Sequence, residues 1–212
     1  MRSNEIEAYK LKLKLTREQR DVLVGLLLGD AHLETQNRGK TYRLKIEYSS
    51  RSREYCDHIY EIFREWVLTP PRRKLVNSNG HHSTNVAFST VSHAAFRFYA
   101  QQFYMEGKKK VPSMIKKLLS PRGLAYWYMD DGSMKSKQSK GLILNTQGFD
   151  RQELKILIKV LEEKFGLDVR ERRQSDGYQI YISGNSFERF LALVDDWVIP
   201  STRYKIPEAR RT

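Results

Sequence analysis

Two apolar runs that each end at an aspartate dominate the sequence: LVGLLLGDAHL at residues 23–33 and LAYWYMDDG at residues 124–132. Runs of this length and composition predict buried helices. The aspartates at their ends, Asp30 and Asp131, are separated by about half of the 212-residue chain. A carboxylate at the C-terminal end of a helix is disfavoured by the helix dipole. The sequence therefore raises the question of what holds a negative charge at each of these helix ends.

The segments that follow each run repeat in the same order. In chain order the repeated elements are a strand-like segment (42–50 and 141–149), an amphipathic helix (53–67 and 151–166), a basic hairpin (72–90 and 169–183) and a second amphipathic helix (93–105 and 186–198). The hairpins are predicted to turn at Asn79-Gly80 and at Asp176-Gly177, because both dipeptides suit tight strand reversals. The order helix, two strands, helix, two strands, helix is therefore expected twice.

This repeat predicts a mixed α+β protein of two pseudo-symmetric halves rather than two independent domains. We expect an N-terminal half at residues 1–107, a connecting segment at 108–123 and a C-terminal half at 124–212. The two apolar helices are expected to pack against each other at the centre. The strands of each half would place one face on helices and leave the other to solvent. The two antiparallel sheets would then form a positively charged saddle.

The chain is strongly basic, with 38 lysines and arginines against 25 acidic residues and a net charge of +13. This charge is not confined to a tail, so it predicts a polyanionic partner. A single cysteine, Cys56, excludes an intramolecular disulfide, and no Cys/His group has the spacing of a structural zinc site. The N-terminus lacks the apolar region of a secretory signal, and no apolar run reaches the roughly 18 residues of a membrane span.

The solvent-facing side of the strands carries the candidate contacts to double-stranded DNA, since a two-stranded ribbon from each half fits a major groove. These candidates are Arg43, Lys45, Arg72, Lys74, His81, Asn145, Arg170, Arg172 and Gln179. For any one of the strand charges, an ordinary solvated charge is an equally good explanation. His81 lies beside a turn glycine, where contact with phosphate and simple exposure to solvent both remain open. The recurrence of these residues in both hairpins favours contact with DNA.

The two aspartates fit a metal site. If the apolar helices pack together, their ends bring Asp30 and Asp131 close, and divalent cations between them would remove the repulsion. Oxygen ligands beside phosphates favour Mg²⁺, and metal ions there activate water and stabilise a leaving oxygen. Their neighbours Ala31 and Asp130 are further metal-site candidates, Asp130 in a supporting or structural role. The alternative is that each aspartate merely ends a helix in a turn; their common position in the repeat favours the metal site.

The runs at 23–31 and 124–132 resemble the two copies of the LAGLIDADG motif. The chain is similar, over nearly its whole length, to the single-chain, intron-encoded LAGLIDADG homing endonucleases of yeast mitochondria. Flanking matches occur at GKTY (39–42), LNTQ (144–147) and YKIP (204–207). The resemblance implies two αββαββα halves whose motif helices form the central interface. It also implies cleavage of a long asymmetric DNA site across the minor groove, leaving 3′ overhangs.

The resemblance further implies the roles of the site residues. Asp30 and Asp131 match the metal-binding carboxylates, while Lys109 and Lys205 match the basic residues that surround the metals, one from each half. Gln147 and Lys45 are weaker candidates for this catalytic group, and a plain phosphate contact is equally plausible for Lys45. The chain departs from the family at Ala31, where glycine is usual, and at Tyr126, where a small residue commonly lets the helices approach. We therefore expect an asymmetric contact, with an aromatic side chain packed over Gly25 and Gly29 of the first helix.

Together these features predict a Mg²⁺-dependent, site-specific DNA endonuclease, with Mn²⁺ or Ca²⁺ able to replace Mg²⁺ in binding. We expect a monomer that acts on double-stranded DNA in the mitochondrion, with no membrane and no protein partner. The alternative is a non-cleaving nucleic-acid-binding protein of the same fold, such as an intron RNA maturase. A binder needs neither motif aspartate, so the retention of both favours the nuclease.

Overall fold

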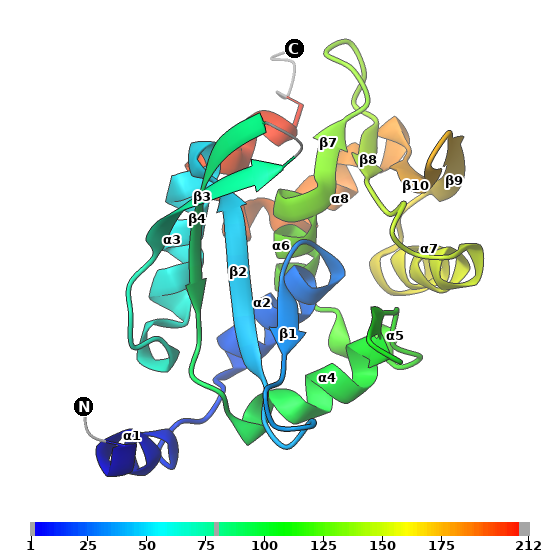
Figure 1. Cartoon of the computed structure of the whole chain (residues 1–212). Coiled ribbons are helices and arrows are strands. Elements are labelled where there is room, and N and C mark those ends of the chain that lie inside the picture. Colours follow the sequence, from blue (N-terminus) through cyan, green and yellow to red (C-terminus); the bar gives the residue numbers. More distant parts are fainter. Residues whose placement is uncertain (1–2, 79–80, 208–212) are drawn as a thin grey trace. The chain divides into compact units, whose positions relative to one another are not determined.

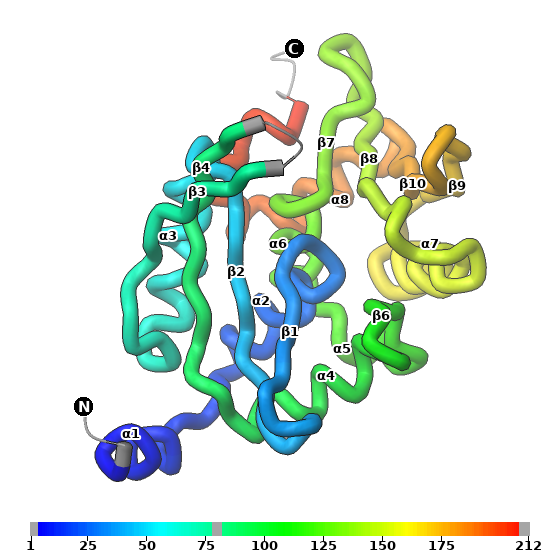
Figure 2. Tube along the Cα trace, in the orientation of Figure 1, coloured from blue at the N-terminus to red at the C-terminus, as the bar shows by residue number. Residues whose placement is uncertain are grey.

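The computed structural model describes residues 3–78 and 81–207, which form two compact units. Unit 1 contains residues 1–20 and 30–101, and unit 2 contains residues 21–29 and 102–212. Residues 21–29, which contain most of the first apolar run, are thus assigned to unit 2 although the segments on either side of them belong to unit 1. Figures 1 and 2 show the course of the chain through the elements of each unit. No helix of the described residues is long and apolar enough to cross a membrane.

Unit 1 is built on an antiparallel sheet of order β1-β2-β4-β3. Its strands are β1 (His32–Glu34), β2 (Arg43–Ser49), β3 (Arg72–Ser78) and β4 (His81–Ser89). Its helical segments are α1 (Ser3–Lys10), η1 (Ser50–Ser52), α3 (Arg53–Ile62), η2 (Arg64–Trp66), η3 (Ala94–Phe96) and most of α4 (Arg97–Phe103). Helix α3 packs against β2 and β4 (Figure 1). Residues alternate between buried and part-exposed along β2, so one face of the sheet meets the helix and the other is free.

Unit 2 repeats this architecture with a sheet of order β7-β8-β10-β9. Its strands are β7 (Gly132–Met134), β8 (Leu142–Leu144), β9 (Val169–Gln174) and β10 (Gly177–Ile182), with a separate pair β5 (Tyr104–Met105) and β6 (Lys108–Lys109). Its helical segments are α5 (Ile115–Leu118), α6 (Pro121–Asp131), α7 (Arg151–Phe165), η4 (Gly184–Ser186), α8 (Phe187–Val194), η5 (Asp195–Trp197) and η6 (Pro200–Lys205). Helix α2 (Arg17–Leu28) enters this unit at Asp21. Helix α7 packs against β9 and β10 (Figure 1).

Helix α7 shows how local sequence determines an element. Asp150 accepts hydrogen bonds from the backbone of Gln152 and Glu153, while the Glu153 side chain accepts from the Asp150 backbone, which completes a capping box. Apolar side chains spaced three and four apart turn inward on the sheet. The helix ends at Gly166, which adopts the left-handed conformation that glycine tolerates best.

The predicted order of helices and strands is confirmed in both repeats, with several differences in detail. The helices expected at 53–67, 93–105 and 186–198 each include a 3₁₀ turn, and the second one ends at Phe103. The sequence did not predict α1 or the β5–β6 pair. The second hairpin turns at Ser175-Asp176, one residue earlier than expected, because Gly177 already pairs with Gln174. The Asn79-Gly80 turn lies outside the described residues.

Candidate functional site

The two apolar helices pack through glycine. A Cβ atom added at Gly25 would lie 2.2 Å from the Gly123 carbonyl oxygen and 2.9 Å from Cβ of Tyr126. One added at Gly29 would lie 2.3 Å from a carboxylate oxygen of Asp130. Side chains larger than hydrogen therefore cannot occupy these positions without moving α6. Cβ of Tyr126 lies against Gly25, whereas Gly29 faces the Asp130 side chain, so the expected packing of one aromatic side chain over both glycines is not what the structure shows.

Both motif aspartates follow directly from this contact zone. Asp30 is exposed and comes immediately after Gly29, while Asp131 is the part-exposed last residue of α6. The Asp131 carbonyl accepts hydrogen bonds from the Asn145 backbone at 3.0 Å and from its side-chain amide at 2.7 Å. Gln179 in turn donates to the Asn145 side chain at 2.6 Å. The end of α6 is therefore connected, through Asn145, to the free face of the sheet in unit 2.

A lysine caps each of these helix ends. The Lys109 ammonium donates to the Gly29 carbonyl at 2.6 Å. The Lys205 ammonium donates to the carbonyls of Met129 at 2.5 Å and Asp130 at 2.7 Å. Each lysine thus reaches the carbonyl of the residue directly before a motif aspartate. A cation at a helix C-terminus offsets the negative end of the dipole, and this arrangement answers how a carboxylate is tolerated there.

The two lysines are held by different means. Lys109 lies in β6, whose tight reversal from β5 uses Glu106 and Gly107 at positive φ. Lys205 ends η6, and its own carbonyl accepts a hydrogen bond from the Tyr128 hydroxyl at 2.7 Å. The Tyr128 ring packs edge-on against Phe190, and burial raises the pKa of this tyrosine far above its usual value. Tyr128 therefore remains a neutral hydroxyl that can donate this bond.

The free face of the sheet in unit 1 carries the predicted cations. Strand register puts Lys45 opposite Ser89, Arg72 opposite Ala87 and Lys74 opposite Asn85, so these cations share one face with Arg43. Their carboxylate partners were not predicted from the sequence.

Glu34 on β1 forms ion pairs with Arg43 and with Lys45, the latter at 3.1 Å. Partial burial acts to raise the pKa of Glu34, but the hydrogen bonds from Arg43 and Lys45 outweigh it, so this pKa lies below its ordinary value. Glu47 pairs with Lys74 at 2.8 Å, and hydrogen bonds from Lys74 and Asn85 lower its pKa. The alternation along residues 42–50 could have placed Glu47 beside the cations, whereas Glu34 required the pairing of β1 with β2.

The free face in unit 2 is more polar and aromatic. Arg172 pairs in register with Gln179, and Arg170 pairs with Tyr181, so these side chains share the face that also bears Asn145. The Arg170 guanidinium lies 4.9 Å from the centre of the Tyr181 ring. Tyr181 is a member of this surface that the sequence analysis did not identify.

Gln147 is half-buried in the loop before α7, and its backbone would lie 3.1 Å from a Cβ atom added at Gly177. Gly177 has φ of +142°, so glycine is required there both by conformation and by this close approach. The side chain of His81 lies outside the part of the chain that the structure describes.

The donor chemistry at the helix ends fits a hard divalent cation. Carboxylates such as Asp30 and Asp131 and main-chain carbonyls are the oxygen ligands such ions prefer. Ala31 is buried and could offer only its carbonyl, and the Asp130 side chain packs on Gly29. Among the described residues no group of three or more His, Cys, Asp or Glu could hold a metal ion.

Comparison with known proteins identifies relatives over the length of the chain. The model of the LAGLIDADG DNA endonuclease family matches residues 20–190. The probable intron-encoded endonuclease 1 of Wickerhamomyces canadensis is 34% identical over 214 residues, covering 96% of this chain and 90% of that protein. The structure of the homing endonuclease I-WcaI bound to its DNA recognition sequence is 31% identical, with a TM-score of 0.91 over 98% of this chain and 94% of that one. The structure of I-DmoI with DNA and Mn is 16% identical with a TM-score of 0.50, covering 82% and 94% of the two chains, so its likeness concerns the fold.

Proposed function

The chain belongs to the LAGLIDADG DNA endonuclease family, and from that premise we propose that it is a homing endonuclease. It would cleave both strands of a long asymmetric DNA site and leave 3′ overhangs. The observation that carries this proposal is the matched pair of helix ends, where Gly29 contacts Asp130 and a lysine donates to the carbonyl before each motif aspartate. Two carboxylates, one from each motif, suit the two strands of a duplex.

We assign Asp30 and Asp131 as the protein ligands of divalent cations and Mg²⁺ as the natural ion. The oxygen donors support this choice, and the I-DmoI structure that contains DNA and Mn is in line with a divalent ion in this fold. When bound, such ions activate water and stabilise the leaving oxygen. Asp130 would support the helix contact instead of binding metal, and Ala31 would contribute at most its carbonyl.

Lys109 and Lys205 would act through their positive charge. Both ammonium groups are anchored to main-chain carbonyls at the helix ends, so little reorganisation would be needed when negative charge develops on a nearby phosphate. The cations on the free faces, with Gln147, Asn145, Gln179 and His81, would contact DNA. Arg43, Lys45 and Lys74 would exchange their carboxylate partners for phosphate or base atoms.

A non-cleaving nucleic-acid-binding protein, such as an intron RNA maturase, is the competing function. Such a binder has no need of a carboxylate at either helix end, where the dipole disfavours it. Both aspartates are present in this chain, which favours the nuclease. We place the protein in mitochondria as an intron-encoded enzyme, in line with its similarity to the intron-encoded relative.

The test begins with selection of cleaved sites from a randomised DNA library in the presence of Mg²⁺. Asp30→Asn and Asp131→Asn should each reduce double-strand cleavage of the selected site by at least about 100-fold, because removal of a metal ligand removes transition-state stabilisation. Binding of the same duplex in Ca²⁺ should remain within about 3-fold of the unsubstituted protein, since base and phosphate contacts are elsewhere.

Asp196→Asn supplies the matched control, because Asp196 is an exposed residue of η5 in unit 2. It should cleave normally. Normal cleavage by either motif variant would refute the assignment of the metal ligands. A protein that binds the library without cutting any member, with or without Mg²⁺ or Mn²⁺, would favour the non-cleaving alternative.

A further inference from the structure

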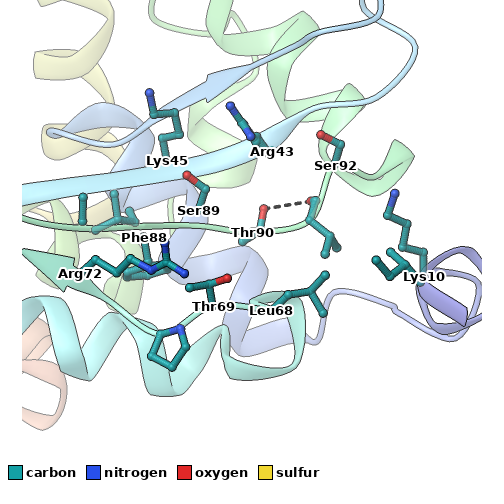
Figure 3. A pocket seen from close by; sticks show the side chains of 15 residues that line it. Lys10, Arg43, Lys45, Leu68, Thr69, Arg72, Phe88, Ser89, Thr90 and Ser92 are labelled. Carbon is teal, nitrogen blue, oxygen red and sulfur yellow. Dashed lines mark hydrogen bonds between the residues drawn. The ribbon is translucent and has the colours of Figure 1, made fainter. Parts of the chain in front are cut away.

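A pocket of about 460 Å³ opens in unit 1 beside the free face of its sheet. Figure 3 shows Lys10 at one end and Arg72 at the other, with Arg43 and Lys45 along β2 between them. Leu68 and Phe88 contribute apolar surface to the lining of the pocket. The pocket therefore joins the predicted DNA-contacting face to α1, a helix outside the αββαββα repeat.

The lining of this pocket is strongly biased in charge. Four of its fifteen residues are lysine or arginine, and none is aspartate or glutamate. The carboxylates that pair with these cations, Glu34 and Glu7, lie outside the lining. A ligand that enters the pocket would therefore meet cations and no carboxylate of the lining, which favours an anion.

The hydroxyl groups in the lining indicate which class of anion the pocket would bind. Ser89 lies opposite Lys45 on the free face, and Thr69 and Ser92 also line the pocket. The Thr90 hydroxyl is engaged inside the protein, because it accepts from the Leu44 backbone at 2.9 Å and donates to the Val91 carbonyl at 3.1 Å. Hydroxyl and cationic donors without base-shaped recognition are typical of contacts to the DNA backbone.

Helix α1 is held by unit 1 in a position that places Lys10 in the lining of the pocket. The Tyr9 hydroxyl donates to the Glu65 carbonyl in η2, which ties the last turn of α1 to the rest of unit 1. Lys10 is the last residue of α1, and only 21% of its side chain is exposed. It forms an ion pair with Glu7 at 2.8 Å. Because Glu7 is 68% exposed and a pair with a solvated partner contributes little energy, a phosphate could displace Glu7 from Lys10.

We propose that this pocket binds backbone phosphates near one end of the duplex, with Lys10 as the principal donor to one phosphate and Arg72 as the principal donor to another. The site extends the DNA interface beyond the sheet and is independent of base sequence. This inference rests on the proposed function, because it needs duplex DNA on the free face of unit 1.

The first experiment measures binding of a duplex of arbitrary sequence as a function of salt concentration. Lys10→Gln should weaken binding by about 3- to 10-fold at low salt and reduce the slope of log K against log salt by about 1, as loss of one phosphate contact requires. Lys10→Arg should retain the slope. Glu7→Gln should strengthen binding, because it removes the competing carboxylate. Lys155→Gln is the control. Lys155 lies on α7, which packs on the helix-covered face of the unit 2 sheet, so this variant should bind DNA like the unsubstituted protein.

The second experiment locates the contact on the selected cleavage site. Duplexes shortened stepwise from each end should lose affinity for the unsubstituted protein at one end before the other, and Lys10→Gln should be insensitive to that loss. Ethylation of individual phosphates should interfere with binding at the same end and not in the variant. An unchanged salt slope for Lys10→Gln in a natively folded protein, or equal sensitivity of both proteins to shortening, would overturn the proposal.

Binding and cleavage by the unsubstituted protein separate the proposed function from the phosphate pocket. If the unsubstituted protein neither binds nor cuts duplex DNA, the proposed function is wrong. If it cuts and Lys10→Gln matches it in affinity, salt slope and length dependence, only the phosphate pocket is wrong. Inhibition of duplex binding by millimolar deoxynucleoside monophosphate, relieved by Lys10→Gln, would instead identify a pocket for a free nucleotide and would also overturn the backbone assignment.

Discussion

At the scale of single residues, Glu34 neutralises two of the cations on the free face of unit 1. It pairs with both Arg43 and Lys45, and all three side chains are about one-third exposed. A carboxylate in this position neutralises the face and would also repel a phosphate that approaches it. Surface ion pairs contribute only about 0–1 kcal/mol to stability. The role of Glu34 is therefore better sought in DNA binding than in folding.

Glu34→Gln should bind non-specific duplex about 2- to 5-fold more tightly, with a steeper dependence on salt, because two more cations become available to phosphates. Discrimination between the selected site and random DNA should fall. Competition binding against labelled random duplex measures both effects. Glu163→Gln is the control, because it removes a comparable ion pair with Lys116 on the helical side of unit 2. It should change neither the non-specific affinity nor the discrimination. Weaker non-specific binding by Glu34→Gln would mean that Glu34 orients Arg43 and Lys45 rather than masking them.

At the scale of elements, the contact between α2 and α6 depends on Gly25. Helix propensity alone predicts that Gly25→Ala stabilises the protein by about 1 kcal/mol. The added Cβ would meet the Gly123 carbonyl oxygen at 2.2 Å, however, and backbone cannot move aside cheaply. We expect a net destabilisation of about 1–3 kcal/mol, in the range of overpacked cores. Urea unfolding followed by circular dichroism measures this change.

Gly148→Ala tests whether steric contact is the cause. A Cβ atom at Gly148 would meet no atom within 4 Å, so its free energy of unfolding should stay within about 0.5 kcal/mol of the starting value. A stabilised Gly25→Ala variant would show that the two helices can separate without cost.

The same elements show what sequence alone could predict. Periodicity identified the long helices, because apolar residues spaced three and four apart need a core to cover them. It could not identify α1, since an eight-residue helix held by a tyrosine hydroxyl leaves no strong periodic pattern. The β5–β6 pair, two residues per strand, is too short for any alternation.

The sequence could propose side chains for the candidate site but could not predict their contacts. The repeat and the family resemblance selected Asp30, Asp131, Lys109 and Lys205. That both lysines would donate to the carbonyl before each aspartate depends on how β6 and η6 reach the helix ends. Main-chain acceptors carry no sequence signature, because every residue has the same carbonyl group.

At the scale of the whole molecule, one chain contains two complete repeats. Each unit has a four-stranded antiparallel sheet with a free face, and each motif contributes one aspartate. A protein with a single repeat would need a second copy to supply the other carboxylate. This chain needs none, and its net charge of +13 opposes self-association when DNA is absent.

We therefore expect a monomer of 25.0 kDa in solution and one protein per duplex. Light scattering coupled to gel filtration measures the mass in solution. Titration of the selected duplex at concentrations well above the dissociation constant measures the number of proteins per duplex. A scattering mass of two chains, or a titration endpoint of two chains per duplex, would contradict a single-chain enzyme in which Asp30 and Asp131 serve one DNA site.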